Sequence, residues 1–177
     1  MKSKCIFALL LLPLLFACNK PEPEPQKPPI NGRLNAVKNG EAWEALAYGW
    51  KSLDSLKNDF YFSAIDKNTG LTHKFSVKNI PLAEKIYEVK PKYDFSNQND
   101  SLIHANFHIV DYDLGLADYR LLDRPGNVFH LTHVDSVTRH FSGTLDLEFI
   151  VINKADDLGL PDTIRIKNGV FFGEVLR

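Results

Sequence analysis

Two segments decide the fold class of this chain, GTLDLEF at residues 143–149 and TIRIK at residues 163–167. In both, apolar and polar side chains alternate. Because successive side chains of a β-strand point to opposite faces, this period of two is typical of a strand with one buried face. The same alternation recurs from Leu34 onward and predicts a β-protein.

Over the rest of the chain the same pattern predicts ten strands in all, near residues 34–38, 42–50, 60–65, 71–78, 85–90, 103–111, 119–123, 127–134, 138–152 and 163–175. Clusters of turn residues separate them, and only residues 50–58 could form a turn of helix. Many short antiparallel strands need a partner layer or closure to bury their apolar face. We therefore expect one all-β domain over residues 34–177, an antiparallel β-sandwich or a closed-barrel-like sheet.

The pair Asn39-Gly40 lies between apolar flanks, and this dipeptide favours the type I′ turn of a β-hairpin. A two-residue loop here places Trp43 opposite Ala36, as a core residue. Continued alternation sends Tyr48 and Trp50 to the other face. These two aromatic side chains are the candidate ligand-facing residues, unless a second packed layer or a crossing loop covers them.

A second Asn-Gly pair, at residues 168–169, predicts a second hairpin by the same reasoning. If these are the two loop residues, one face of the hairpin carries Ile164, Ile166, Phe171 and Val175. The other face is mostly polar. This consistency predicts that the four apolar residues enter the core and that Gly169 has a positive φ angle.

The N-terminus has the pattern of an export signal. Lys2 and Lys4 precede an unbroken apolar run that ends at Cys18, and the run is too short to span a bilayer. Residues 1–17 are therefore predicted to be a cleaved leader. Cys18 is then the one cysteine of the mature chain, and acylation would explain a lone cysteine in an exported protein.

Residues 18–33 follow as a tether in which proline stands at nearly every second position from Pro21 to Pro29. Such a segment stays extended and would hold the domain away from a membrane. Loss of Lys2 and Lys4 with the leader takes the formal net charge from −1 to −3. A mildly acidic chain with 24% charged residues gives no indication of a nucleic-acid partner.

The residues Leu15-Phe16-Ala17-Cys18 resemble the lipobox of bacterial lipoproteins, which implies lipid on Cys18 and a membrane as partner. The folded part is similar to lipoproteins of unknown function from Bacteroidota, through residues 37–45, 141–145 and 162–171. Glu22 and Glu24 resemble the acidic export signal of those bacteria. The resemblance implies an outer-membrane anchor and favours the cell surface over the periplasm, and it transfers no catalytic residue.

Four short matches resemble the acceptor for O-glycans in the same bacteria, an aspartate followed by a hydroxyl residue and an apolar residue. The candidate acceptors are Ser55, Ser101, Ser136 and Thr163. All four are expected in loops or turns, where an enzyme could reach them. Asp-Ser is also ordinary turn chemistry, so each match alone carries little weight.

The motifs of well-defined enzymes are absent from the mature chain, which has no Gly-x-Ser-x-Gly, Ser-x-x-Lys, His-Glu-x-x-His or Gly-x-Gly. We therefore expect no enzyme and no cofactor. His104 and His108 share a strand face, but their Cα atoms would lie about 13 Å apart, too far for one metal ion without other geometry. They are weak metal candidates, and we expect them to line the solvated face.

These observations favour a membrane-anchored binding or interaction module. A hydrolase acting on glycans stays open, because the two carboxylates of such an enzyme come from distant strands and leave no spacing signature. An envelope accessory protein that pairs through a sheet edge is a third alternative.

Overall fold

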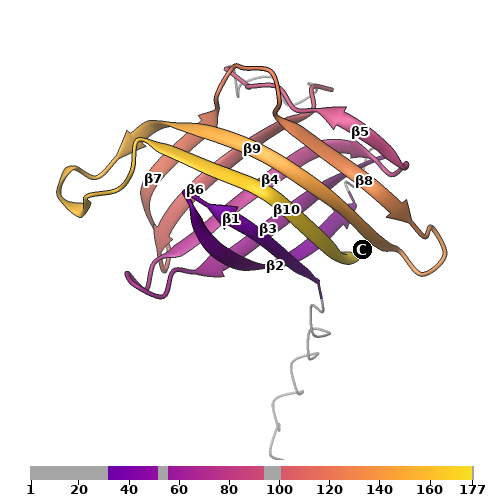
Figure 1. Ribbon diagram of the computed structural model, residues 1–177, viewed down its shortest axis with the longest axis horizontal. Helices are drawn as coiled ribbons and strands as arrows, with labels where there is room; N and C mark the ends of the chain where they lie inside the picture. The colour runs from indigo at the N-terminus through magenta and orange to yellow at the C-terminus, as the bar shows by residue number, and fades with distance from the viewer. Residues whose placement is uncertain (1–31, 52–55, 94–100, 177) are drawn as a thin grey trace, which may run out of the picture.

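The computed structural model describes residues 32–51, 56–93 and 101–176, and in them ten strands form a single sheet (Figure 1). The strands are β1 (Arg33–Lys38), β2 (Glu41–Lys51), β3 (Lys57–Ile65), β4 (Thr72–Pro81), β5 (Lys85–Glu88), β6 (His104–Asp111), β7 (Leu114–Leu121), β8 (Val128–Val134), β9 (His140–Lys154) and β10 (Thr163–Leu176). One 3-10 turn, η1 (Asp156–Leu158), joins β9 to β10. The expected all-β class is confirmed.

The sheet curves into a ring. Antiparallel pairing runs from β2 through β3, β4, β6, β7 and β9 to β10, and β1 pairs with both β10 and β2, so the two ends of the sheet meet. The last residues of β10 also pair in parallel with β2. β9 pairs with β8 through its first half and with β7 through its second half, so β8 and β5 diverge from the ring as a flap.

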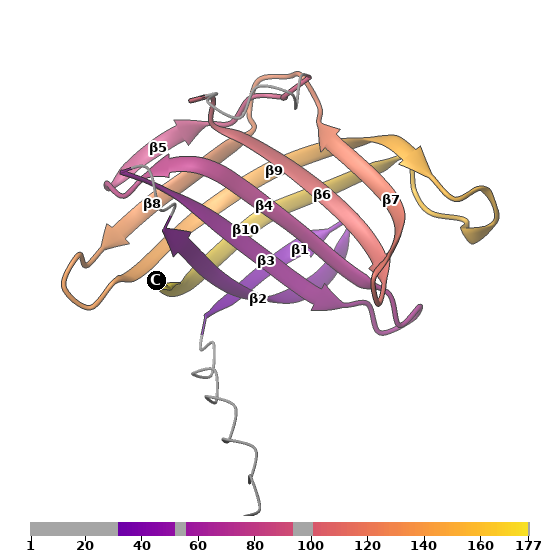
Figure 2. The same ribbon diagram turned by 180° about the vertical axis from the view of Figure 1, so that it is seen from behind.

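Figures 1 and 2 show the two sides of this ring, with β8, β9 and β10 in front in one view and β3, β4 and β6 in front in the other. Aromatic side chains from both sides fill the interior. Phe62 stacks on Phe75 with ring centroids 4.5 Å apart, and Phe129 stacks on Phe171 at 4.8 Å. Because these rings occupy the centre, a ligand has access to the outer face and to the ends of the ring rather than to its middle.

The hairpin predicted at Asn39-Gly40 is confirmed. Both residues have positive φ angles, 50° and 90°, as a type I′ turn requires. Trp43 lies opposite Ala36 and faces the core, whereas Trp50 points outward. The ten predicted strands are also present, and the largest displacement concerns residues 119–123, where β7 begins five residues earlier.

The prediction of a hairpin at Asn168-Gly169 is wrong, because β10 runs through both residues as one strand. The pairing of β10 with β9 shifts register between Ile166 and Gly169, which marks a β-bulge. Asn168 takes the left-handed conformation, with a φ of 53°, and Gly169 does not. The predicted core residues, Ile164, Ile166, Phe171 and Val175, are nevertheless buried.

The strands account for nearly all regular structure in residues 32–51, 56–93 and 101–176. No helix in these segments has the length and apolar character needed to cross a membrane.

Candidate functional site

A row of polar and aromatic side chains crosses the outer face of four neighbouring strands. Tyr48 on β2 lies opposite Tyr61 on β3, which lies opposite Ser76 on β4, which lies opposite Asn106 on β6. We call these four residues the outer row. Alternation along each strand produces it, since their sequence neighbours face the filled interior. Figure 2 looks onto this side of the ring.

The two tyrosines of the outer row stack on each other. Their ring centroids are 5.3 Å apart and their planes differ by 16°. The hydroxyl of Tyr61 donates to a carboxylate oxygen of Asp59 at 3.4 Å. Burial and the negative charge of Asp59 raise the pKa of Tyr61 to about 12, so the phenol remains a neutral donor at physiological pH. The pair forms a fixed apolar surface with a polar edge.

The other half of the outer row supplies hydrogen-bonding groups. The Ser76 hydroxyl donates to the Asn106 side-chain oxygen at 2.6 Å. Ser76 is only 7% exposed and lies at the floor of an open pocket of about 350 Å³ that Tyr48, Tyr61 and Asn106 also line. The bond leaves the two N–H protons of the Asn106 amide for another acceptor.

His108, Lys74 and Lys78 line the same pocket. The Nδ1 atom of His108 lies 2.6 Å from a carboxylate oxygen of Asp118 on β7, so that histidine is held by a protein partner. A pocket of this size, with an aromatic wall and a few convergent polar groups, has the usual composition of a small-ligand site.

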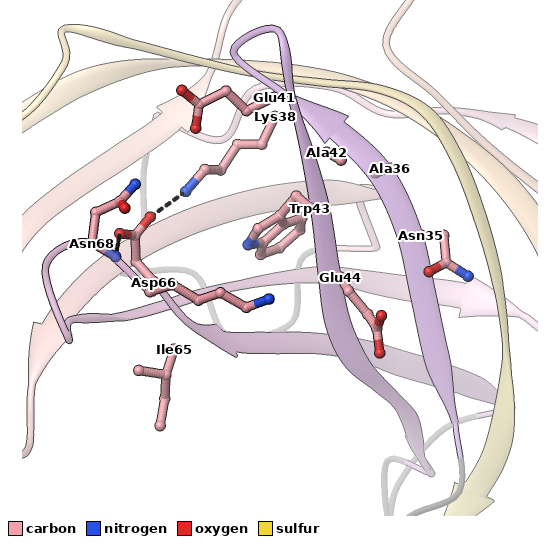
Figure 3. A pocket seen from close by; sticks show the side chains of 11 residues that line it. Asn35, Ala36, Lys38, Glu41, Ala42, Trp43, Glu44, Ile65, Asp66 and Asn68 are labelled. Carbon is pink, nitrogen blue, oxygen red and sulfur yellow. Dashed lines mark hydrogen bonds and ion pairs between the residues drawn. The ribbon is translucent and has the colours of Figure 1, made fainter.

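A second hollow, of about 440 Å³, opens at the mouth of the ring beside Trp43 (Figure 3). Lys38 of β1 reaches across this mouth, and its ammonium group lies 3.1 Å from Asp66 and 2.6 Å from Nδ1 of His73. The same ammonium group lies 5.7 Å from the centroid of the Trp43 ring. These contacts join the β1–β2 hairpin to the β3–β4 hairpin, which are not neighbours in the sheet at this point.

Three side chains at the mouth, Lys38, Asp66 and His73, hold one another, and we call this group the closed clamp. Burial opposes the ionisation of Asp66, but hydrogen bonds from Lys38 and from the backbone amides of Thr69 and Asn68 lower its pKa to about 2. Burial and the charge of Lys38 lower the pKa of His73 to about 4. At neutral pH, therefore, a charged lysine is held between an ionised aspartate and a neutral histidine.

No family model, curated protein or solved structure matches the chain. The choice between the two hollows therefore rests on their geometry. At the mouth, Asp66 and His73 already hold the Lys38 ammonium group. The two buried nitrogens without a hydrogen-bond partner among the described residues, Trp43 Nε1 and His73 Nε2, are closed off from solvent. The outer row keeps donors and ring surface within an open pocket, so we take it as the candidate site.

Of the two aromatic residues predicted to face a ligand, Tyr48 and Trp50, only the first lies in the pocket lining. Tyr48 lines the pocket of the outer row. Trp50, which is 46% exposed, lies two residues further along β2, opposite Asp59 and outside the pocket lining. Sequence reasoning missed Tyr61, although the alternation of Phe60 and Phe62 around it was a usable signal that it faces outward.

The two histidines predicted as weak metal ligands, His104 and His108, lie in different surroundings. His108 faces the pocket, but His104 is 6% exposed, so its expected place on the solvated face is wrong. Two described residues of the connection from β5 to β6 lie against His104: Lys90 forms a backbone β-bridge with it, and the Leu102 carbonyl oxygen lies 3.0 Å from the His104 Nδ1 atom. Burial lowers its pKa. The described residues contain no group of three or more metal-ligating side chains.

The O-glycan candidates fall into three groups. Ser101 and Ser136 are exposed, in a loop and in a turn respectively. Thr163 is the first residue of β10 and half-buried, so its expected place in a loop is wrong. Ser55, like Cys18 and the tether, lies outside the described residues.

Proposed function

We propose that this protein is a membrane-anchored binding module that captures a glycan on its outer row. The observation that carries the proposal is the stacked pair Tyr48–Tyr61 lining an open pocket beside Ser76 and Asn106. A sugar ring has an apolar face of C–H groups and an edge of hydroxyls. The aromatic pair complements the first, and the hydroxyl and amide groups complement the second.

Binding rather than hydrolysis fits the state of the neighbouring carboxylate. Asp59 accepts a hydrogen bond from the Tyr61 hydroxyl and another, at 3.1 Å, from the backbone amide of Asn79. Both carboxylate oxygens of Asp59 thus accept from protein donors, whereas the two carboxyl groups of a glycosidase face the scissile bond of the substrate. Asp59 therefore positions Tyr61 in this proposal.

The sequence features of the N-terminus supply the location. Lipid on Cys18 would anchor the chain in the outer membrane, and the proline-rich residues after it would hold the domain at the cell surface. A surface anchor makes a capture function useful, because polymers outside the cell cannot diffuse freely to a site inside it.

A glycan-array screen of the full chain tests the proposal, with Tyr61→Ala as the variant and Tyr112→Ala as the matched control. Tyr112 is 93% exposed in the β6–β7 turn, away from the pocket. Loss of the stacking surface should weaken capture by about tenfold, which corresponds to a contact of roughly 1.4 kcal/mol. Equal capture by Tyr61→Ala and wild type would refute the site, and formation of a cleaved product would show a hydrolase instead.

A further inference from the structure

Two lysines flank the floor of the candidate pocket. Lys74 and Lys78 stand two residues before and two residues after Ser76 on β4, so all three side chains point to the outer face. The Cα atoms of the two lysines are separated by about 13 Å, given the rise of roughly 3.3 Å per strand residue. The pocket thus has a cation toward each end and the tyrosine pair along one side.

Neither lysine forms an ion pair or a side-chain hydrogen bond with another of the described residues. Other lysines of the chain are paired: Lys38 with Asp66, Lys90 with Glu88, and Lys154 with Asp162. Lys67 and Lys85 also form no ion pair with a described residue, so the feature that distinguishes Lys74 and Lys78 is that both line the same pocket.

Two carboxylates near the outer row, Asp59 and Asp118, have contacts other than these lysines. Asp59 accepts hydrogen bonds from Tyr61 and Asn79, and Asp118 lies 2.6 Å from Nδ1 of His108. Both carboxylates keep their negative charge, but neither lines the pocket, whose lining includes Lys74 and Lys78 and no aspartate or glutamate. Charge of one sign within a pocket attracts ligands of the opposite sign.

From this arrangement we infer that the ligand of the outer row is an anionic oligosaccharide, with carboxylate or sulfate groups that pair with Lys74 and Lys78 while a sugar ring lies against the tyrosine pair. The inference rests on the proposed function and names its ligand class. A protein partner is disfavoured because the pocket, at about 350 Å³, suits a few sugar units rather than a folded surface.

Calorimetric titration of the full chain in detergent tests the inference with two matched pairs of polymers. Polygalacturonate and its methyl ester differ by the carboxylate charge, and dextran sulfate and dextran differ by the sulfate charge. We expect at least one anionic polymer to bind about tenfold more tightly than its neutral counterpart, since two partly exposed ion pairs together contribute that much. Which anionic polymer binds distinguishes carboxylate from sulfate recognition.

The decisive variant is the double substitution Lys74→Gln and Lys78→Gln, and its matched control is Lys67→Gln with Lys85→Gln, two exposed lysines outside this pocket. The first should remove the preference for the anionic polymer and the second should preserve it. Equal weakening by both would overturn the inference, because it would show attraction by overall charge.

Three further outcomes are decisive. Equal binding of charged and neutral polymers that Tyr61→Ala abolishes would overturn the anionic ligand and retain the stacking site. Binding of no polymer in the set would overturn the inference itself, while capture of another glycan on the array would still support the proposed function. Added salt should weaken anionic binding, and an unchanged affinity at high salt would contradict a role for the lysine charges.

Discussion

The buried histidine at the ring mouth should make the protein unstable in mild acid. His73 is neutral in the folded chain because burial and Lys38 lower its pKa to about 4, from the ordinary value near 6.5. In the unfolded chain His73 binds a proton as the pH falls through 6.5. In the folded chain it stays unprotonated until the pH approaches 4, so between these values the unfolded state binds more protons than the folded state. Stability is therefore fully present above pH 6.5 and is lost as the pH falls toward 4.

The two pKa values give the size of this effect. Between pH 7 and pH 5 the linkage relation predicts a loss of about 2 kcal/mol in the free energy of unfolding from His73 alone. His73→Leu should remove this portion of the pH dependence. His133→Leu is the control, because His133 is exposed.

Urea denaturation at pH 7 and pH 5, for wild type and both variants, measures the effect. His104 is also buried with a lowered pKa and adds a background slope that all three proteins share. The informative quantity is therefore the difference in slope between His73→Leu and wild type. If His73→Leu loses as much stability between the two pH values as wild type does, His73 is not held neutral and the description of the mouth as a closed clamp is wrong.

Three shorter predictions follow from exposure, packing and the leader. Trp50→Ala should shift the melting temperature by only a few degrees, because a half-exposed side chain contributes less than the 3–5 kcal/mol of a buried aromatic residue; a larger loss in a thermal melt would show that Trp50 is covered. Gly143→Ala should lower the free energy of unfolding by roughly 1–3 kcal/mol, since its Cβ would lie 2.0 Å from the His130 carbonyl oxygen and 2.6 Å from the Phe171 ring. Urea denaturation measures this loss, and an unchanged midpoint would contradict this packing of β9. Cys18→Ala should move the protein to the aqueous phase in detergent partitioning, and recovery in the detergent phase would show another anchor.

Local patterns predicted the strands well because alternation is a property of each strand alone. It reports which face is buried, and that sufficed for Trp43 and for Ile164 and Ile166. Closure of the ring was left open between a sandwich and a barrel-like sheet because it depends on pairing between the ends of the chain. Leu34 of β1 pairs with Phe171 of β10, and no local pattern links positions so far apart.

The two Asn-Gly pairs show why one signal can have two structural meanings. A two-residue turn and a one-residue bulge both reverse the alternation, so either explains why Ile166 and Phe171, five residues apart, face the same side. The two outcomes differ in pairing. The segments flanking Asn39 pair with each other, whereas both segments flanking Asn168 pair with β9. That choice is made by the rest of the sheet.

The candidate site depends on pairing in the same way. Alternation alone places Tyr48 on the outer face, and it would also place Tyr61 there, but it does not bring the two rings together. A register shift between β3 and β4 follows Asn58, after which Tyr61 lies opposite Ser76. Asp59 stabilises this irregularity by accepting a hydrogen bond from the Asn79 amide, and it also holds the Tyr61 hydroxyl. One aspartate therefore links the sheet irregularity to the orientation of the tyrosine, which is why a reading of single strands could identify the face but not the pocket.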